Sequence, residues 1–132
     1  MVKVLIVSLF VVIAVFLRSV GGYVEGHFFP VVIFDRFERV DQIDDVSVRI
    51  WGAATRLREC QFSHLEWRLG NAGAYSVVDL AFEETAKVRH QGTFSFGPWR
   101  LHLTRKQLRE RSYAWVYHRC HWLWLTRTAF YG

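Results

Sequence analysis

The chain opens with an apolar run long enough to cross a membrane, and this run constrains every later choice of fold. Residues 4–17 contain no charged side chain, and Ser8 is their only polar residue. An α-helix over residues 2–20 would be about 28 Å long at ~1.5 Å per residue, close to the ~30 Å hydrocarbon core of a bilayer. Lys3 and Arg18 stand near its ends, where long basic side chains can reach lipid headgroups. We therefore expect a single transmembrane signal-anchor helix in contact with membrane lipid.

Two other interpretations of this segment stay open. Lys3, a short apolar core and the small residues of Ser19-Val20-Gly21 also fit a secretory signal that is cleaved. The run is hydrophobic all round, which fits burial in protein as well as in lipid. A buried helix of a soluble protein, or one docked inside a larger assembly, is the third interpretation. Both secretory interpretations place residues 21–132 outside the cytoplasm.

The rest of the chain has the alternating pattern of short β-strands. Apolar and polar residues alternate over 46–51 and again over 57–68, where a slip at 62–64 predicts a β-bulge. The glycine-rich stretch at 70–73 predicts a turn. Residues 55–84 are therefore expected to form one long hairpin.

A short helix interrupts this pattern. Two strands are expected around Gly92 and Gly97. Thr104 followed by Gln107 then forms a predicted capping box, because each side chain can bond the other residue's backbone amide. One or two helical turns at 105–110 follow.

The final strand places alternate residues on two faces. One predicted face holds Ala114, Val116, His118 and Cys120, and the other holds Tyr113, Trp115, Tyr117 and Arg119. Six to eight short strands with regular turns favour an antiparallel β-sandwich, so the predicted class is mainly β with one short helical turn. The predicted division is an anchor at 1–20, a lead-in or linker with an edge strand at 21–44, and the sandwich domain at 45–132.

The two cysteines could pair with each other, bind a metal or stay as separate thiols. A zinc site would draw on Cys60, His64, His118, Cys120 and His121. On a strand, His118 and Cys120 lie ~6–7 Å apart and His121 points to the other side, whereas zinc needs all its ligands within ~2.3 Å. We expect no metal and no cofactor. An exported chain favours a Cys60–Cys120 disulfide, and separate thiols are the alternative for a cytoplasmic domain.

Residues 45–132 resemble immunoglobulin-like domains. Cys60 and Cys120 lie on an early and a late strand, and a short helical turn precedes the second cysteine. Two positions depart from that family's pattern. His118 stands where a tyrosine is usual two residues before the second cysteine, and Trp67 lies closer to the first cysteine than the usual core tryptophan does.

The layout of the whole chain resembles small membrane-anchored proteins encoded by bacteriophages and prophages. The features that carry this resemblance are the GPW stretch at 97–99 and the HRCH stretch at 118–121, before a terminal aromatic strand. The resemblance implies a bacterial envelope, with the domain in the periplasm, or a virion. It implies no known activity.

No nucleophile elbow, phosphate loop or paired-carboxylate signature occurs in the sequence, so we expect no enzyme. The predicted partner-binding residues are basic or aromatic: Arg105, Lys106, Arg109, Arg111, Trp122 and Trp124. The alternative for the basic stretch is the solvated face of a short helix with Leu108 packed inward.

We expect a membrane-anchored, non-enzymatic protein whose exported sandwich binds another protein in an envelope or phage assembly. The alternative is a structural virion component whose apolar helix is buried in protein or in a virion membrane. Self-association into a homo-oligomer is open, and nucleic acid is not an expected partner.

Overall fold

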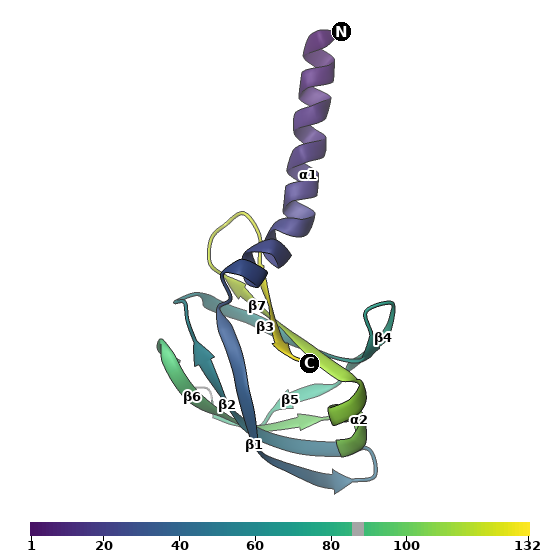
Figure 1. Ribbon diagram of the computed structural model, residues 1–132, viewed down its shortest axis with the longest axis vertical. Coiled ribbons are helices and arrows are strands. Elements are labelled where there is room, and N and C mark those ends of the chain that lie inside the picture. Colours follow the sequence, from purple (N-terminus) through teal and green to yellow (C-terminus); the bar gives the residue numbers. More distant parts are fainter. Residues whose placement is uncertain (86–88) are drawn as a thin grey trace.

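A long helix stands on a sandwich of two antiparallel sheets in the computed structural model, which describes residues 1–85 and 89–132 (Figure 1). The elements are α1 (Val2–Phe28), β1 (Val32–Asp44), β2 (Ser47–Arg56), β3 (Gln61–Asn71), β4 (Ala74–Val78), β5 (Leu80–Phe82), β6 (Gly92–Leu101), α2 (Arg105–Arg111), β7 (Ser112–Arg119) and β8 (Thr126–Tyr131). One sheet has the strand order β1-β2-β6-β5 and the other has the order β4-β3-β7-β8. The expected mainly β architecture is confirmed.

The strand order is that of an immunoglobulin-type sandwich. The first sheet corresponds to strands A, B, E and D of that fold, and the second corresponds to strands C′, C, F and G. Strands β1–β2, β3–β4, β5–β6 and β7–β8 pair antiparallel within a sheet. The chain crosses between the sheets after β2, β4 and β6.

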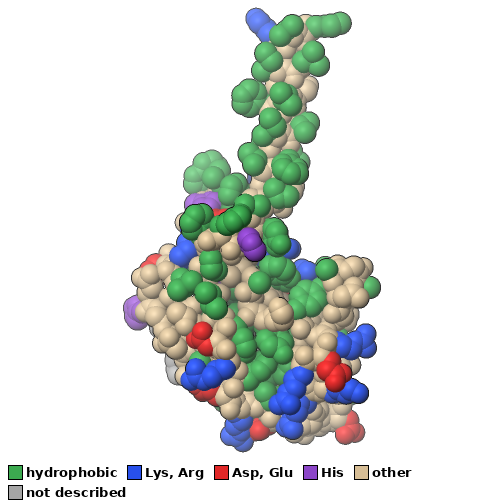
Figure 2. All heavy atoms as spheres, in the orientation of Figure 1, with side chains coloured by type: hydrophobic (Ala, Val, Ile, Leu, Met, Phe, Trp, Pro, Cys, Tyr) green, Lys and Arg blue, Asp and Glu red, His purple; other side chains and the backbone are tan. Residues whose placement is uncertain are grey.

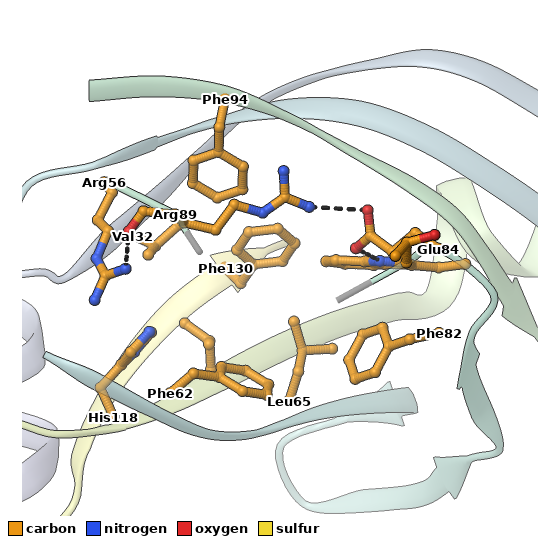
Figure 3. A pocket seen from close by; sticks show the side chains of 13 residues that line it. Val32, Arg56, Phe62, Leu65, Phe82, Glu84, Arg89, Phe94, His118 and Phe130 are labelled. Atoms are coloured by element: carbon orange, nitrogen blue, oxygen red, sulfur yellow. Dashed lines mark hydrogen bonds and ion pairs between the residues drawn. The ribbon is translucent and has the colours of Figure 1, made fainter. Parts of the chain in front are cut away.

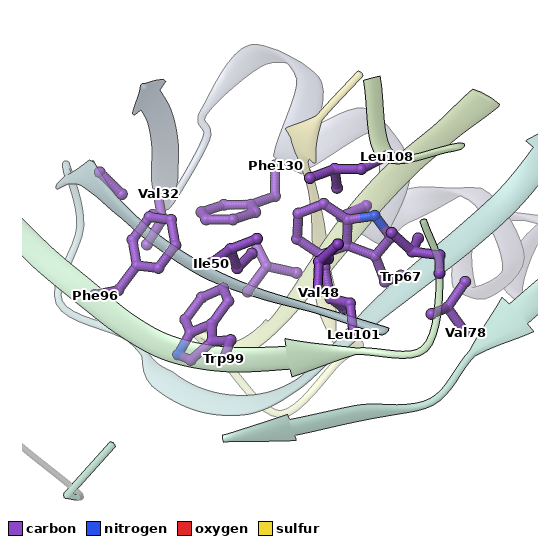
Figure 4. Close-up of a cluster of buried hydrophobic side chains, with 14 of the residues drawn as sticks. Val32, Val48, Ile50, Trp67, Val78, Phe96, Trp99, Leu101, Leu108 and Phe130 are labelled. Carbon is purple, nitrogen blue, oxygen red and sulfur yellow. The ribbon is translucent and has the colours of Figure 1, made fainter. Parts of the chain in front are cut away.

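The core lies between the sheets and is built from alternate residues of the strands (Figure 4). Val48 and Ile50 of β2 are fully buried, and so is Trp67 of β3. The indole ring of Trp67 stacks on Tyr131 at 5.3 Å between ring centroids and meets Phe130 edge-on at 6.4 Å. Trp67 thus packs the centre of one sheet against the last strand of the chain.

Several local predictions are confirmed. The Thr104 hydroxyl accepts a hydrogen bond from the Gln107 amide at 3.1 Å, and the Gln107 side chain accepts one from the Thr104 amide at 2.9 Å. Leu108 of α2 is fully buried. The pairing register of β3 with β7 shifts between Phe62 and His64, at the predicted bulge. Ala114, Val116 and His118 of β7 face the core together.

The segment at 21–44 contains the expected edge strand, β1, but its first part is helix rather than linker. Helix α1 continues through residues 21–28, and β1 pairs with β2 along its whole length from Val32 to Asp44. Pro30 separates the two elements, since proline lacks the amide that would extend the helix. Only a short connection joins α1 to the sandwich, and residues 21–44 belong to the folded body.

The predicted hairpin at 55–84 is also too long. Only β3 and β4 form it, around the turn expected at 70–73. Residues 57–60 connect the two sheets, and β5 pairs with β6 in the opposite sheet. The two strands expected around Gly92 and Gly97 form a single strand, β6.

The first part of α1 projects away from the sandwich. The side chains of residues 2–17 are exposed, and Figure 2 shows hydrophobic side chains along the visible face of the projecting part. The helix is long and apolar enough to cross a membrane. None of the described residues buries the apolar half of α1, so that half is not part of the core of the sandwich.

A disulfide joins Cys60, in the connection between β2 and β3, to Cys120, directly after β7. The two Cα atoms lie 4.7 Å apart, within the usual range for a disulfide. The bond lies directly beyond the Gln61–Arg119 pair, so it closes the end of the β3–β7 ladder within one sheet, at the end of the sandwich that contacts α1.

The disulfide should contribute strongly to stability, because it closes a loop of 60 residues. In the chain-entropy account, reduction should lower the free energy of unfolding by about 4 kcal/mol. Denaturant unfolding of the full-length protein with and without reductant measures this loss. Peptide mapping without reductant should recover the two cysteines joined, and two alkylatable thiols in the native protein would contradict the pairing.

Candidate functional site

Helix α1 meets β8 through a face made of three glycines. Gly21, Gly22 and Gly26 are the buried residues of the helix. A Cβ atom on Gly22 would overlap the carbonyl oxygen of Leu125, and one on Gly26 would overlap the carbonyl oxygen of Arg127. The helix backbone therefore lies directly against the backbone of the chain entering β8, and no larger residue fits at these contacts.

Glu25, on the same turn of α1, binds groups from three separate parts of the sandwich. Its carboxylate accepts hydrogen bonds from His121 Nε2 at 2.7 Å, Thr126 Oγ1 at 2.8 Å and Trp124 Nε1 at 3.1 Å. The guanidinium of Arg58 lies 3.4 Å away. The Glu25 side chain is only 13% exposed. One carboxylate thus joins the helix to the β2–β3 connection and to the residues that lead into β8.

These contacts keep the Glu25 carboxylate ionised. Burial alone would raise the pKa of Glu25, but the hydrogen bonds from His121, Thr126 and Trp124 outweigh it, so the pKa lies below its ordinary value. The stabilisation of the folded protein by Glu25 is therefore fully present at any pH above 4.5, the ordinary pKa of the side chain. This stabilisation is lost as the pH falls through the lower folded-state pKa.

The histidines near the disulfide point in different directions. His118 is 3% exposed and faces the core, whereas His121 binds Glu25. The ring of His64 stacks on Tyr117 at 4.2 Å between centroids. Among residues 1–85 and 89–132, no group of three or more histidine, cysteine, aspartate or glutamate residues could hold a metal ion.

The predicted partner-binding residues do not form one surface. The Arg105 guanidinium donates to the carbonyl of Val40, which ties α2 to β1. Lys106, Arg109 and Arg111 are exposed and form no ion pair with any described residue. Basic side chains gather over α2 on the face in Figure 2, whereas the loop between β7 and β8 lies beside α1 in Figure 1.

The two tryptophans of that loop have opposite environments. The Trp124 ring packs against Gly21, where a Cβ atom would stand 2.8 Å from the indole, and its Nε1 binds Glu25. Trp122 is 85% exposed. Trp124 thus belongs to the contact surface of α1 around Gly21, Gly22, Glu25 and Gly26, which we call the seat of α1. Trp122 is free to contact another molecule.

A pocket of about 450 Å³ lies between the sheets (Figure 3). Its size falls within the range of small-molecule sites. Most of its wall is apolar, from Val32, Phe62, Leu65, Phe82, Phe94, Trp99, Val116 and Phe130. Polar side chains line it at two places, with Arg56 and His118 at one and Glu84 and Arg89 at the other (Figure 3).

The polar groups of the pocket differ in how far they are already bonded. Glu84 accepts hydrogen bonds from Trp99 Nε1 at 2.6 Å and from Arg89 at 2.8 Å. Nδ1 of His118 has no hydrogen-bond partner among the described residues. Burial, together with the nearby charges of Arg56 and Arg58, lowers the pKa of His118 to about 4, so its ring is neutral at pH 7. The pocket can receive an apolar group that ends in a hydrogen-bonding atom.

Sequence reasoning missed Glu25 and the three glycines. The signal was present, because Gly22-Tyr-Val-Glu-Gly26 has the small-xxx-small spacing that lets a helix backbone approach a neighbour closely. That spacing places both glycines on one helix face, and Glu25 precedes the second one. An isolated carboxylate after an apolar run, beside such a face, indicates a buried contact rather than a solvated linker.

The glycine face can be tested with Gly26→Ala. Alanine favours a helix by ~1 kcal/mol over glycine, so an open site would be stabilised. Because its Cβ would overlap the Arg127 carbonyl oxygen, we expect a net loss of about 1–3 kcal/mol, as for overpacking. Thermal unfolding of the full-length protein in lipid nanodiscs measures it. The control is Val24→Ala, an exposed position on the same helix, and equal stability of both variants would contradict the packed seat.

Glu25→Gln should remove the acid sensitivity of this seat. The amide keeps the shape and loses the charge, so at neutral pH we expect a loss of about 1.5–3 kcal/mol, as for hydrogen bonds to a charged group. The parent should approach the variant's stability as the pH falls below the ordinary value for glutamate. Unfolding midpoints across this range measure the convergence. Glu59→Gln, at a largely exposed carboxylate, should follow the parent, and parallel pH curves for the parent and Glu25→Gln would contradict the assignment.

Comparison with known proteins finds no match to a family model, to a curated protein or to a solved structure. The strand order and the residue contacts described above are the basis for the functional proposal.

Proposed function

We propose that this protein is a membrane-anchored, non-enzymatic recognition module. Residues 2–20 of α1 span a bilayer, and the sandwich binds another protein on the non-cytoplasmic side of a bacterial envelope or in a phage assembly. The observation that carries the proposal is a small sandwich packed in a fixed position on a helix whose other half is exposed and apolar. The sandwich also presents basic side chains that form no ion pair with any described residue.

The bare half of α1 supports the membrane part of the proposal. Leaving large apolar side chains in water is unfavourable, and a contiguous exposed apolar surface marks contact with lipid or protein. The backbone of α1 is hydrogen-bonded within the helix, as a bilayer requires. The Cys60–Cys120 bond fits an oxidising compartment, which supports export of the sandwich.

The exposed face of α2 supports the recognition part of the proposal. Lys106, Arg109 and Arg111 carry positive charge that no described residue neutralises through an ion pair. Arginine binds carboxylates with two parallel hydrogen bonds. The partner surface that fits this face is therefore acidic. The capping box and buried Leu108 hold α2 in place without using these side chains.

The same features also support the second candidate, a structural component of a phage particle. In that case the apolar half of α1 would be buried in protein or in a virion membrane. Mass spectrometry of purified virions separates the candidates, because a structural component is present in the particle at stoichiometric amounts and an envelope protein is not.

Reversing Arg109 and Arg111 to Glu should weaken capture of an acidic partner without disturbing the fold, since surface changes usually alter stability by less than ~0.5 kcal/mol. Capture by the parent should fall with added salt, because salt screens exposed charges, and the variant should lack this dependence. The measurement is a pull-down with full-length protein from the native host. Reversing Arg36 and Arg39, each 65% exposed on β1, is the control for net charge. Identical partners for the parent and the α2 variant would show that α2 only faces solvent.

A further inference from the structure

The loop at residues 120–125, between β7 and β8, lies beside α1 (Figure 1) and contains two exposed apolar residues. Trp122 is 85% exposed and Leu123 is 45% exposed. Among the described residues after Met1, Trp122 is the most exposed large hydrophobic side chain. Neighbouring apolar residues at a loop tip are unfavourable in water, so their exposure points to contact with another phase or molecule.

The loop has a defined shape. His121 accepts a hydrogen bond from the Leu123 amide on Nδ1 at 3.2 Å and donates through Nε2 to Glu25. Trp124 packs on Gly21. The two ends of the exposed pair are thus fixed to residues 21–25 of α1. The tip cannot move along the helix without breaking these contacts.

The contacts of the loop also define its height along α1. An open hollow lies between α1 and the sandwich. Leu123 and Trp124 line it together with Arg18 and Ser19 of the helix. The uncharged run of the helix ends at Leu17, directly before Arg18. The tip of the loop therefore lies level with the end of the segment that would occupy the hydrocarbon core.

The side chains around this level suit a membrane surface. Arg18, Arg119 and Arg127 line the same hollow as Leu123. The Arg127 guanidinium lies over the rings of Tyr23, at 5.0 Å, and Trp115, at 4.1 Å. Amphipathic aromatic rings collect at the boundary between lipid and water, and basic side chains are attracted to anionic headgroups. Glu25, the acidic group packed against this loop, is already held by hydrogen bonds inside the seat.

We propose that the 120–125 loop enters the headgroup region of the bilayer that α1 spans, with Trp122 and Leu123 at the boundary between headgroups and acyl chains. This inference rests on the proposed membrane anchoring of residues 2–20. It makes the sandwich a second point of lipid contact. Lipid is favoured over a protein partner for this loop because the chain itself holds the loop at the height of the bilayer surface.

Quenching of tryptophan emission by brominated lipid tests the proposal. Full-length protein is placed in nanodiscs of phosphatidylcholine and phosphatidylglycerol, with and without bromine near the carbonyl end of the acyl chains. The chain contains 6 tryptophans, so the parent is compared with Trp122→Phe. We expect this substitution to remove the largest single share of the quenched emission. The exposed position of Trp122 makes the variant safe for the fold, which circular dichroism checks.

Trp51→Phe is the matched control. Trp51 lies on β2 under the Arg39 guanidinium, on the strand that pairs with β1 and β6, so its replacement should leave the amount of quenched emission unchanged. An unchanged amount of quenched emission in Trp122→Phe, or free access of aqueous iodide to Trp122 in the nanodisc, would overturn the loop proposal in favour of solvent or a protein partner.

Alkaline carbonate extraction of native membranes separates failure of the loop from failure of the anchor. Full-length protein should stay with the membrane pellet. If it does and Trp122 is not quenched, the anchor stands and the loop proposal is wrong. If the protein is extracted, the membrane anchoring and the loop proposal are both wrong.

Discussion

The close approach of the α1 backbone to the backbone entering β8 is the contact on which the arrangement of this protein depends. Three glycines make it possible, because any Cβ atom on that face would meet Trp124 or a carbonyl oxygen. The approach brings Glu25 within hydrogen-bonding distance of His121, Trp124 and Thr126. A helix that would otherwise be a flexible tether becomes a packed element of the domain.

The end of the sandwich nearest α1 also holds the disulfide and a group of arginine hydrogen bonds. The disulfide closes the end of the β3–β7 pair there, and the Arg56 guanidinium donates to the carbonyls of Arg58, Cys60 and Arg89. Arg58 in turn reaches Glu25 and the carbonyl of Phe29. These bonds fix the β2–β3 connection from both sides. The disulfide and the hydrogen bonds of Arg56, Arg58 and Glu25 therefore all act where α1 joins the sandwich.

The parts of the fold that sequence predicts are those determined by neighbours within a few positions. The capping box of α2, the bulge near Ser63 and the buried face of β7 depend on local spacing, and each is present. The helical continuation of residues 21–28 depends on β8, about a hundred positions later, so composition indicated a linker instead. Trp122 and Trp124 have opposite environments for the same reason. A loop without periodicity does not show which of its aromatic side chains will meet a distant helix, and the predicted partner surface combined residues that the fold separates.

The short connection between α1 and β1 has a mechanical consequence. Val31 is fully buried, its amide bonds the Thr128 hydroxyl, and its carbonyl accepts from Leu57. Because these contacts leave no flexible hinge at the connection, α1 and the sandwich move as one rigid body. Any tilt of the helix turns the whole domain, and a sideways pull on α2 is transmitted as torque to the apolar end. A partner of the kind proposed for α2 would then bind at a distance from the helix that the sandwich itself sets.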